Sequence, residues 1–194
     1  MKLILATTSP YRIEVFTKSN IPFIAEGSEV DEYTGDRPTD PMALTAYLAQ
    51  LKAEAVAKNH TEGFVVWFDS VCFFEWKVFE KPKTREEAFM RLQAISEKMI
   101  EYHTWIHIID ATTHTTLSDT TKTEMHMRKF TDQEINFYLD NCNEEYKKHA
   151  HALSPEKYYS MSFIHKVVGE PYGVIWTPLS RIMEMLQEMW FSLV

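Results

Sequence analysis

The stretch Phe64-Val65-Val66-Trp67-Phe68-Asp69-Ser70-Val71-Cys72-Phe73-Phe74 places one carboxylate inside an otherwise almost wholly apolar run. Its first five residues have the composition of a buried strand, and Val71 to Phe79 is predicted to form a short hairpin around Glu75. A carboxylate in such surroundings costs several kcal/mol unless it is paired or bound to a metal. Ligands bind at the carboxyl ends of strands in open α/β sheets, so Asp69 is a candidate functional residue. The alternative is an aspartate in a turn between two strands.

Outward from this stretch, predicted strands alternate with predicted helices, which indicates an α/β domain over residues 1–194. Thr84 with Glu87, and Thr131 with Glu134, have the spacing of capping boxes at helix starts. The acidic segment from Glu29 to Asp40 is predicted to be a loop. The pattern predicts strands at 2–6, 21–26, 64–68, 102–109, 120–127 and 163–168, and helices at 10–20, 41–59, 84–95, 131–141 and 178–189.

The composition excludes several classes of protein. The chain has 194 residues and a net charge of -8, from 20 Lys+Arg and 28 Asp+Glu, so general nucleic-acid binding is not expected. No apolar run is long enough to span a membrane. The two cysteines cannot form a disulfide framework, which favours a cytoplasmic location. There are only 5 glycines, so any phosphate contacts are expected from side chains and helix ends rather than from a glycine loop.

The segment Thr7-Thr8-Ser9-Pro10-Tyr11-Arg12 joins the first predicted strand to the first predicted helix. Free N–H groups and the helix dipole make such a junction suited to an anion, and the hydroxyls and Arg12 add donors. The alternative is simply a well-capped helix.

Four further charged residues are candidates, and for each the alternative is a solvated surface side chain. Lys52 lies on a predicted amphipathic helix and Lys81 in a predicted loop before Pro82, where solvated lysines are the usual case. Asp31 and Glu32 lie in the acidic loop, where solvation is also the usual case, but together with Asp69 they could hold a hard cation through oxygen ligands.

The histidines suggest a metal site only weakly. His149 and His151 are two residues apart, and His103 and His107 four apart, spacings that share a face on a strand. No Cys or His pair completes a zinc pattern, so a zinc site is not the favoured interpretation.

Seven segments together resemble the Maf family of nucleoside triphosphate pyrophosphatases, over nearly the whole chain and in the same order. The family patterns are I-L-A-S-x-S-P-R/W-R, (I/V)-D-E, L-A-x-x-K-A, D-T-V or D-Q-V, (G/E)-K-P, S-G-x-x-H-x-V-x-T and G-L-P-L. The matching segments are Ile4 to Arg12, Glu29 to Glu32, Leu48 to Ala53, Asp69 to Val71, Glu80 to Pro82, Ser96 to Thr104, and Pro178-Leu179.

The resemblance implies a Maf/ITPase-like α/β fold, with a mixed sheet in two lobes around a deep central cleft. It also implies a homodimer and the house-cleaning hydrolysis of a nucleoside triphosphate to the monophosphate and pyrophosphate, with Mg²⁺ or Mn²⁺. Such chemistry needs a carboxylate to activate water and hold metal, and cations to stabilise the charge that develops on the phosphates.

Each role falls on a matching position of this sequence. The resemblance implies that Asp69 and Glu32 hold the metal, with Asp69 as the base. It implies that Arg12, Lys52 and Lys81 clamp the phosphates. Substrate contacts are then expected from Thr7, Ser9, Tyr11 and Ser70.

The resemblance does not decide between two branches of the family, which act on different substrates. Tyr11 stands where one branch has Arg and acts on pyrimidine triphosphates, and another has Trp and acts on 7-methylguanosine triphosphate. An aromatic ring at Tyr11 can stack on a cationic methylated base, and Val71-Cys72 also favours the second branch.

The chain also departs from the family. Family glycines are replaced by Phe68, Glu97 and Trp176, and a family histidine by Ile100. A replaced glycine predicts a changed φ or a changed backbone approach, so a protein that binds nucleotides without hydrolysing them is the alternative. The related inosine and xanthosine triphosphate pyrophosphatases fit less well, because their opening motif has Asn and Lys where this chain has Ser9 and Arg12.

Overall fold

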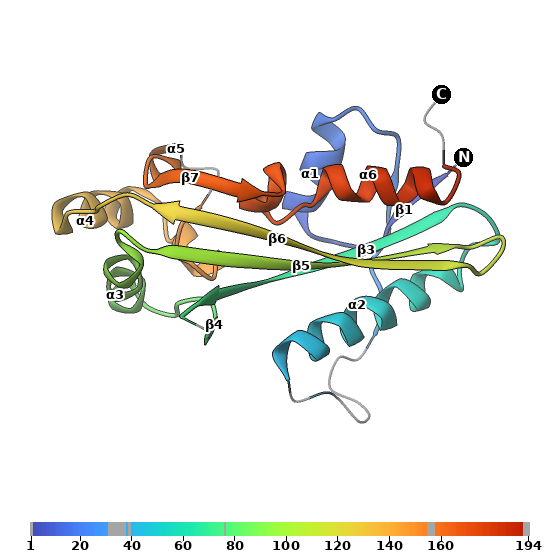
Figure 1. Cartoon of the computed structure of the whole chain (residues 1–194), viewed down its shortest axis with the longest axis horizontal. Coiled ribbons are helices and arrows are strands. Elements are labelled where there is room, and N and C mark those ends of the chain that lie inside the picture. The colour runs from blue at the N-terminus through green and yellow to red at the C-terminus, as the bar shows by residue number, and fades with distance from the viewer. Residues whose placement is uncertain (1, 31–37, 39, 76, 155–157, 192–194) are drawn as a thin grey trace. The chain divides into compact units, whose positions relative to one another are not determined.

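The computed structural model describes residues 2–30, 38, 40–75, 77–154 and 158–191, and Figure 1 shows their arrangement. Strands and helices alternate as the sequence predicts. The elements are β1 (Leu3–Leu5), α1 (Pro10–Lys18), β2 (Ile24–Ala25), α2 (Pro41–Ala57), β3 (Phe64–Phe74), β4 (Lys77–Phe79), α3 (Arg85–Ile95), β5 (Met99–Asp110), β6 (Thr116–Met127), α4 (Asp132–Asn141), η1 (Glu145–Lys148), α5 (Tyr158–Met161), β7 (Ile164–Gly169), η2 (Pro171–Ile175) and α6 (Leu179–Glu188).

The strands of the described residues form a seven-stranded mixed sheet in the order β2-β1-β3-β5-β6-β7, with β4 paired to β3. β1 runs parallel to β2 and to β3, and Leu5 lies opposite Val66. β4 runs antiparallel to β3, and β7 antiparallel to β6. The predicted mixed α/β sheet is therefore confirmed.

The chain divides into two compact units. The first contains residues 1–70, 104–121 and 175–194, and the second contains residues 71–103 and 122–174. The strands β3, β5 and β6 each contribute residues to both units. The deep cleft expected from the family resemblance remains a prediction.

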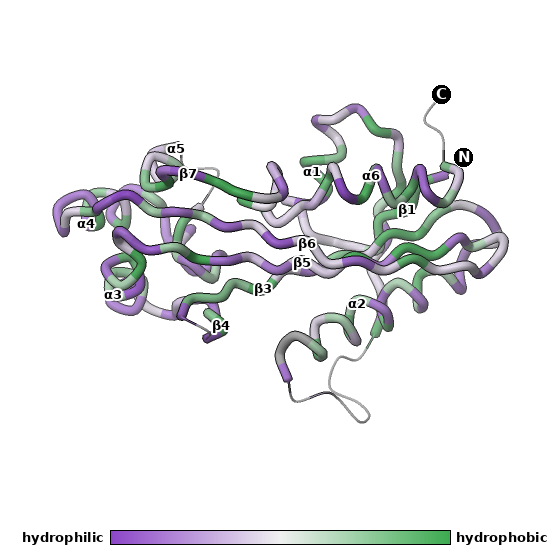
Figure 2. The backbone as a smooth tube through the Cα atoms, viewed as in Figure 1, coloured by the Kyte–Doolittle hydropathy of each residue, from purple (hydrophilic) through white to green (hydrophobic). Residues whose placement is uncertain are grey.

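In the first unit, helices cover both faces of the sheet, with α2 on one side and α1 and α6 on the other (Figure 1). Leu3 and Leu5 of β1 pack in one core cluster with α1 and α6, while Ile4 packs in a second cluster with α2. Burial on both faces explains why β1 and the first part of β3 are continuously apolar rather than alternating (Figure 2).

The second unit packs α3 against α4. Ala88, Leu92 and Ile95 form the buried side of α3. Arg85 reaches from α3 to α4, where it donates to Asp140 at 2.5 Å and to Asn136 at 2.9 Å.

The structure corrects one detail of the opening stretch. Phe64–Phe74 is one uninterrupted strand, so Asp69 lies within a strand and neither at its end nor in a turn. The parallel pairing of β3 with β1 ends at Val66, because β1 stops at Leu5. Asp69 therefore lies just beyond the end of that parallel pairing, which keeps it beside the β1–α1 junction. The predicted hairpin turn is present at Glu75, which has a positive φ.

Helix starts follow the predicted caps. The Thr131 and Glu134 side chains form a full capping box for α4, and the Thr84 hydroxyl accepts from the N–H of Glu87. The Glu87 carboxylate accepts from the N–H of Lys83, so the capping box predicted from Thr84 and Glu87 is only half formed. Among the described helices, none has the length and apolar character needed to cross a membrane.

Two of the residues that replace family glycines have a backbone conformation that would suit glycine. Glu97 has φ 58° and Trp176 has φ 57°, in the left-handed region that disfavours side chains. Phe68, the third replacement, lies inside β3. Glu97 and Trp176 therefore carry side chains at positions whose backbone would suit glycine.

Candidate active site

One hydroxyl group, that of Thr7, holds the junction between β1 and α1. The N–H of Ser9 donates to the buried Thr7 hydroxyl at 3.1 Å. Ser9 is the N-cap residue of α1, but its side chain makes no capping bond. Thr7 therefore shapes the turn, and the Ser9 hydroxyl is not used to cap the helix.

α1 brings Arg12 to Asp69. Arg12 Nη2 donates to Asp69 Oδ1 at 2.5 Å, and the two side chains are 14% and 40% exposed. The pairing accounts for the carboxylate in an apolar stretch, since an opposite charge offsets much of the cost of partial burial. It also leaves Asp69 open to solvent.

Two aromatic rings of β3 lie under the cations of this site. The Arg12 guanidinium carbon is 4.9 Å from the Phe68 ring centroid and 5.4 Å from the Trp67 ring centroid. Lys52 Nζ, from α2, is 4.6 Å from the Trp67 ring centroid. The structure thus brings Arg12, Lys52 and Asp69 together around Trp67, a residue that the sequence presents only as core.

The other predicted substrate contacts in the first unit have structural partners. The Ser70 hydroxyl is hydrogen-bonded to the buried Thr104 hydroxyl at 2.7 Å. The Tyr11 and Trp176 rings form a T-shaped pair, with 6.3 Å between the centroids and 78° between the ring planes.

Lys81 belongs to the second unit, in the loop that follows β4. The neighbouring carbonyl of Glu80 accepts a hydrogen bond from Arg91 of α3, which also donates to the Ala150 carbonyl at 2.5 Å. The guanidinium carbon of Arg91 lies 4.6 Å from the Phe79 ring centroid. Nothing in the sequence pattern distinguishes Arg91 from other helix-surface arginines.

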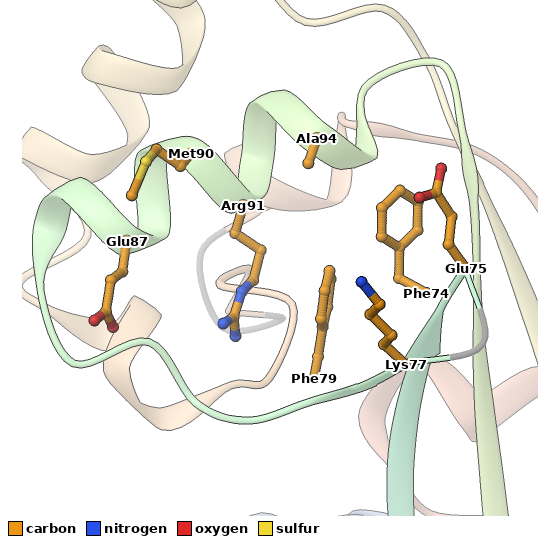
Figure 3. A pocket seen from close by; sticks show the side chains of 8 residues that line it. All are labelled: Phe74, Glu75, Lys77, Phe79, Glu87, Met90, Arg91 and Ala94. Carbon is orange, nitrogen blue, oxygen red and sulfur yellow. The ribbon is translucent and has the colours of Figure 1, made fainter.

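Arg91 also lines a cavity of about 380 Å³ between the β3–β4 hairpin and α3 (Figure 3). The cavity walls include Phe74 and Phe79, with Lys77 and Glu87 at its edge. Burial lowers the pKa of Arg91. The carbonyl contacts occupy this guanidinium, so we assign it a structural role in the second unit.

His149 and His151 lie next to the anchored Ala150 and are almost fully buried. Burial lowers the pKa of His149 to about 4 and that of His151 to about 3, so both rings are neutral at pH 7. They lie outside the strands, whereas His103 and His107 both lie on β5. Within the described residues, no group of three or more His, Cys, Asp or Glu side chains could hold a metal ion.

Among the described residues, one side chain of the candidate site is suited to bind a divalent cation. Mg²⁺ in nucleotide enzymes takes one or two carboxylates and completes its shell with water and phosphate oxygens. Asp69 is partly exposed and has the required chemistry. Glu32, the second predicted ligand, and its neighbour Asp31 lie outside the described residues.

Comparison with known proteins agrees with the predicted family. A dTTP/UTP pyrophosphatase of Caldicellulosiruptor saccharolyticus is 31% identical over 198 residues, which cover 100% of this chain and 97% of that protein. A dTTP/UTP pyrophosphatase of Bacillus cereus strain G9842 is 29% identical, with 96% and 95% covered.

Among solved structures, the Ham1 protein of Staphylococcus aureus aligns with a TM-score of 0.43 and 15% identity, over 66% of this chain and 72% of that one. The dITP/XTP pyrophosphatase of Mycobacterium abscessus aligns with a TM-score of 0.41 and 11% identity, over 67% and 76%. The family model described as Maf-like protein matches residues 2–189, nearly the whole sequence. The chain therefore belongs to the Maf family.

Proposed function

We propose that this protein is a nucleoside triphosphate pyrophosphatase, which hydrolyses its substrate to the nucleoside monophosphate and pyrophosphate. The observation that carries the proposal is the grouping of Asp69 with Arg12 and Lys52. Membership of the Maf family and the names of the relatives support the same reaction.

The three side chains divide the work between proton transfer and charge stabilisation. Water attacks the α-phosphorus and must lose a proton, which Asp69 accepts. Arg12 contacts Oδ1 of Asp69, so Oδ2 is the oxygen that we assign to the attacking water. Arg12 and Lys52 bind the phosphate oxygens, whose negative charge grows as the bond to pyrophosphate breaks.

Two further parts of the proposal rest on the family motifs. Lys81 is assigned to phosphate binding, and Thr7, Ser9, Tyr11 and Ser70 to contacts with the rest of the substrate. A divalent metal, Mg²⁺ or Mn²⁺, held by Asp69 with Glu32, would neutralise phosphate charge when bound. A cytoplasmic homodimer is the expected assembly, and light scattering on the purified protein measures the number of copies.

The names of the relatives favour dTTP and UTP as substrates. The Tyr11 ring favours 7-methylguanosine triphosphate, because a ring face can stack on a cationic base. The alternative of binding without hydrolysis rests on the lost glycines and on Ile100. Glu97 and Trp176 have a left-handed backbone that would suit glycine, which weakens the part of that alternative that depends on these two positions.

The test measures pyrophosphate release from dTTP, UTP, CTP, ATP, GTP, ITP and 7-methyl-GTP with Mg²⁺ or Mn²⁺. We expect turnover of dTTP and UTP by the wild type, and its loss in Asp69→Asn. Asp119→Asn is the matched control, because Asp119 also pairs with an arginine at 2.5 Å. A folded wild type that releases no pyrophosphate from any triphosphate would overturn the proposed activity. Preference for 7-methyl-GTP would reassign the substrate and leave the reaction intact.

A further inference from the structure

Trp67 contacts both cations of the candidate active site. Lys52 and Arg12 come from different helices, α2 and α1, yet each lies over the same indole ring. Two lysine or arginine charges held near each other repel, and the repulsion is strongest where little water separates them. The negative face of an indole offsets part of that cost, and tryptophan does so better than the other aromatic residues.

The indole is itself firmly held. Trp67 is only 7% exposed and packs in the core cluster formed with α2. Ala49 and Ala53 flank Lys52 along the helix and are fully buried in the same cluster. Their small side chains let the ring approach α2 closely, so Lys52 Nζ can lie over it.

The indole is not kept in place by a hydrogen bond of its own. Trp67 Nε1 is buried and has no hydrogen-bond partner among the described residues. Leaving a buried donor unsatisfied is unfavourable, so an aliphatic side chain would fill this core position at less cost. What an aliphatic side chain cannot replace is the ring under the two cations.

We infer that Trp67 is a positioning residue, which holds Lys52 and Arg12 at a separation suited to a polyphosphate. The inference rests on the proposed function for its substrate and extends it to a residue that makes no phosphate contact. Asp69 completes the arrangement by accepting a hydrogen bond from Nη2 of the same Arg12 guanidinium.

Two variants of Trp67 distinguish the effect of its aromatic face from the effect of filling the core position. Trp67→Phe keeps a weaker aromatic face and removes the unsatisfied N–H, whereas Trp67→Leu removes the aromatic face. Trp105→Leu is the matched control, since Trp105 packs against the same core cluster and no cation lies over it among the described contacts. Melting temperatures are measured for all three variants, so that loss of fold is recognised.

We expect Trp67→Leu to lower kcat/KM by about tenfold or more, and Trp67→Phe to stay within about threefold of the wild type. Trp105→Leu should lower the melting temperature about as much as Trp67→Leu and leave kcat/KM nearly unchanged. A purely structural role would make activity follow the melting temperature in all three variants. That result, or a folded Trp67→Leu with wild-type kcat/KM, overturns the inference.

Binding of pyrophosphate without metal, measured by calorimetry, separates this inference from the proposed reaction. The dissociation constant should rise about tenfold in Trp67→Leu and little in Trp67→Phe. If the wild type turns over no triphosphate but this order of affinities is found, the reaction is wrong and the role of Trp67 stands. Equal affinities in the wild type and Trp67→Leu overturn the role of Trp67, whatever the turnover.

Discussion

Two arginine–aspartate pairs in the first unit have nearly the same geometry. Arg12 binds Asp69 and Arg181 binds Asp119, both at 2.5 Å. The two aspartate side chains are similarly exposed, 40% and 38%. The ion pair itself therefore does not distinguish a functional site from a structural contact.

The charges around the two pairs differ in sign. Arg181 also contacts Glu184 at 3.0 Å and Glu188 at 2.8 Å, so one cation meets three carboxylates, and these contacts raise its pKa. Lys52 and Arg12 share the Trp67 ring, so among the described contacts two cations lie close to the Asp69 carboxylate. Two neighbouring cations suit the Asp69 site to an anionic ligand, in a chain whose net charge is -8.

Removing the cations gives the largest effect that this comparison predicts. Arg12→Ala and Lys52→Ala should each lower kcat/KM for a nucleoside triphosphate by about 100-fold or more, because each removes charge that stabilises the transition state. Arg181→Ala should stay within about threefold of the wild type. Pyrophosphate release under identical conditions measures all three. Equal losses in Arg12→Ala and Arg181→Ala would show that a pair of neighbouring cations does not mark the site.

Arg91 in the second unit is a third kind of arginine, because it donates hydrogen bonds to backbone carbonyls rather than to carboxylates. Arg91→Ala leaves the carbonyls of Glu80 and Ala150 without this donor, and should lower the free energy of unfolding by about 1–3 kcal/mol. Arg85→Ala breaks an exposed pair on the same helix and should lower it by less than about 1 kcal/mol. Urea denaturation compares the two variants. A smaller effect for Arg91→Ala than for Arg85→Ala would contradict the assigned structural role.

The buried histidines predict acid sensitivity in the second unit. The folded pKa values of His149 and His151, about 4 and about 3, lie below the ordinary value, so the unfolded chain takes up protons first. Stability is then complete above about pH 6.5 and falls as the pH is lowered toward 4. Each histidine contributes a slope of up to about 1.4 kcal/mol per pH unit.

Urea denaturation between pH 7 and pH 5 measures that slope, in a range where most carboxylates stay ionised. His151→Gln should reduce the slope, while His165→Gln, at an exposed position of β7, should leave it unchanged. A wild-type free energy of unfolding that stays constant from pH 7 to pH 5 would contradict the neutral, buried state of both rings.

Much of the fold follows from local sequence signals. The capping residues Thr84 and Thr131 place the starts of α3 and α4 correctly. The long strand around Asp69 was predicted in two pieces, because a charged residue inside an apolar run indicates a break. Within the continuous strand, the carboxylate pairs with Arg12, which lies 57 residues away in sequence. Single-sequence patterns do not contain such long-range contacts.

Some residues of the candidate site can also be predicted from the sequence, and others cannot. Asp69 is indicated by its apolar surroundings and Arg12 by the strand–helix junction, whereas the role of Lys52 follows only from a family motif. The structure brings these three residues together. Trp67 was missed because a buried aromatic residue in a strand looks like core packing, and only the positions of Lys52 and Arg12 reveal its second contact. Glu32 lies outside the described residues, so its assignment stays a prediction.

The smallest predicted effect concerns a third ion pair, Glu97–Lys129, which is longer than the two arginine–aspartate pairs. Glu97 lies 3.9 Å from Lys129, both side chains are well exposed, and such a pair contributes almost nothing to stability. Glu97 also has a left-handed backbone, which costs a side-chain-bearing residue about 1–2 kcal/mol and costs glycine none of it. Glu97→Gly should therefore raise the free energy of unfolding by about 0.5–1 kcal/mol, after the greater entropy of an unfolded glycine is subtracted.

Lys129→Ala is the control for Glu97→Gly, because it removes the same ion pair and leaves the backbone strain in place. Urea denaturation should find that variant within about 0.5 kcal/mol of the wild type. A stabilised Glu97→Gly beside a neutral Lys129→Ala would assign the gain to backbone strain at position 97. A destabilised Glu97→Gly would mean that the Glu97 carboxylate contributes more to the stability of the fold than the backbone strain costs. The Glu97–Lys129 and Arg181–Asp119 pairs would then differ only in how much they stabilise the fold.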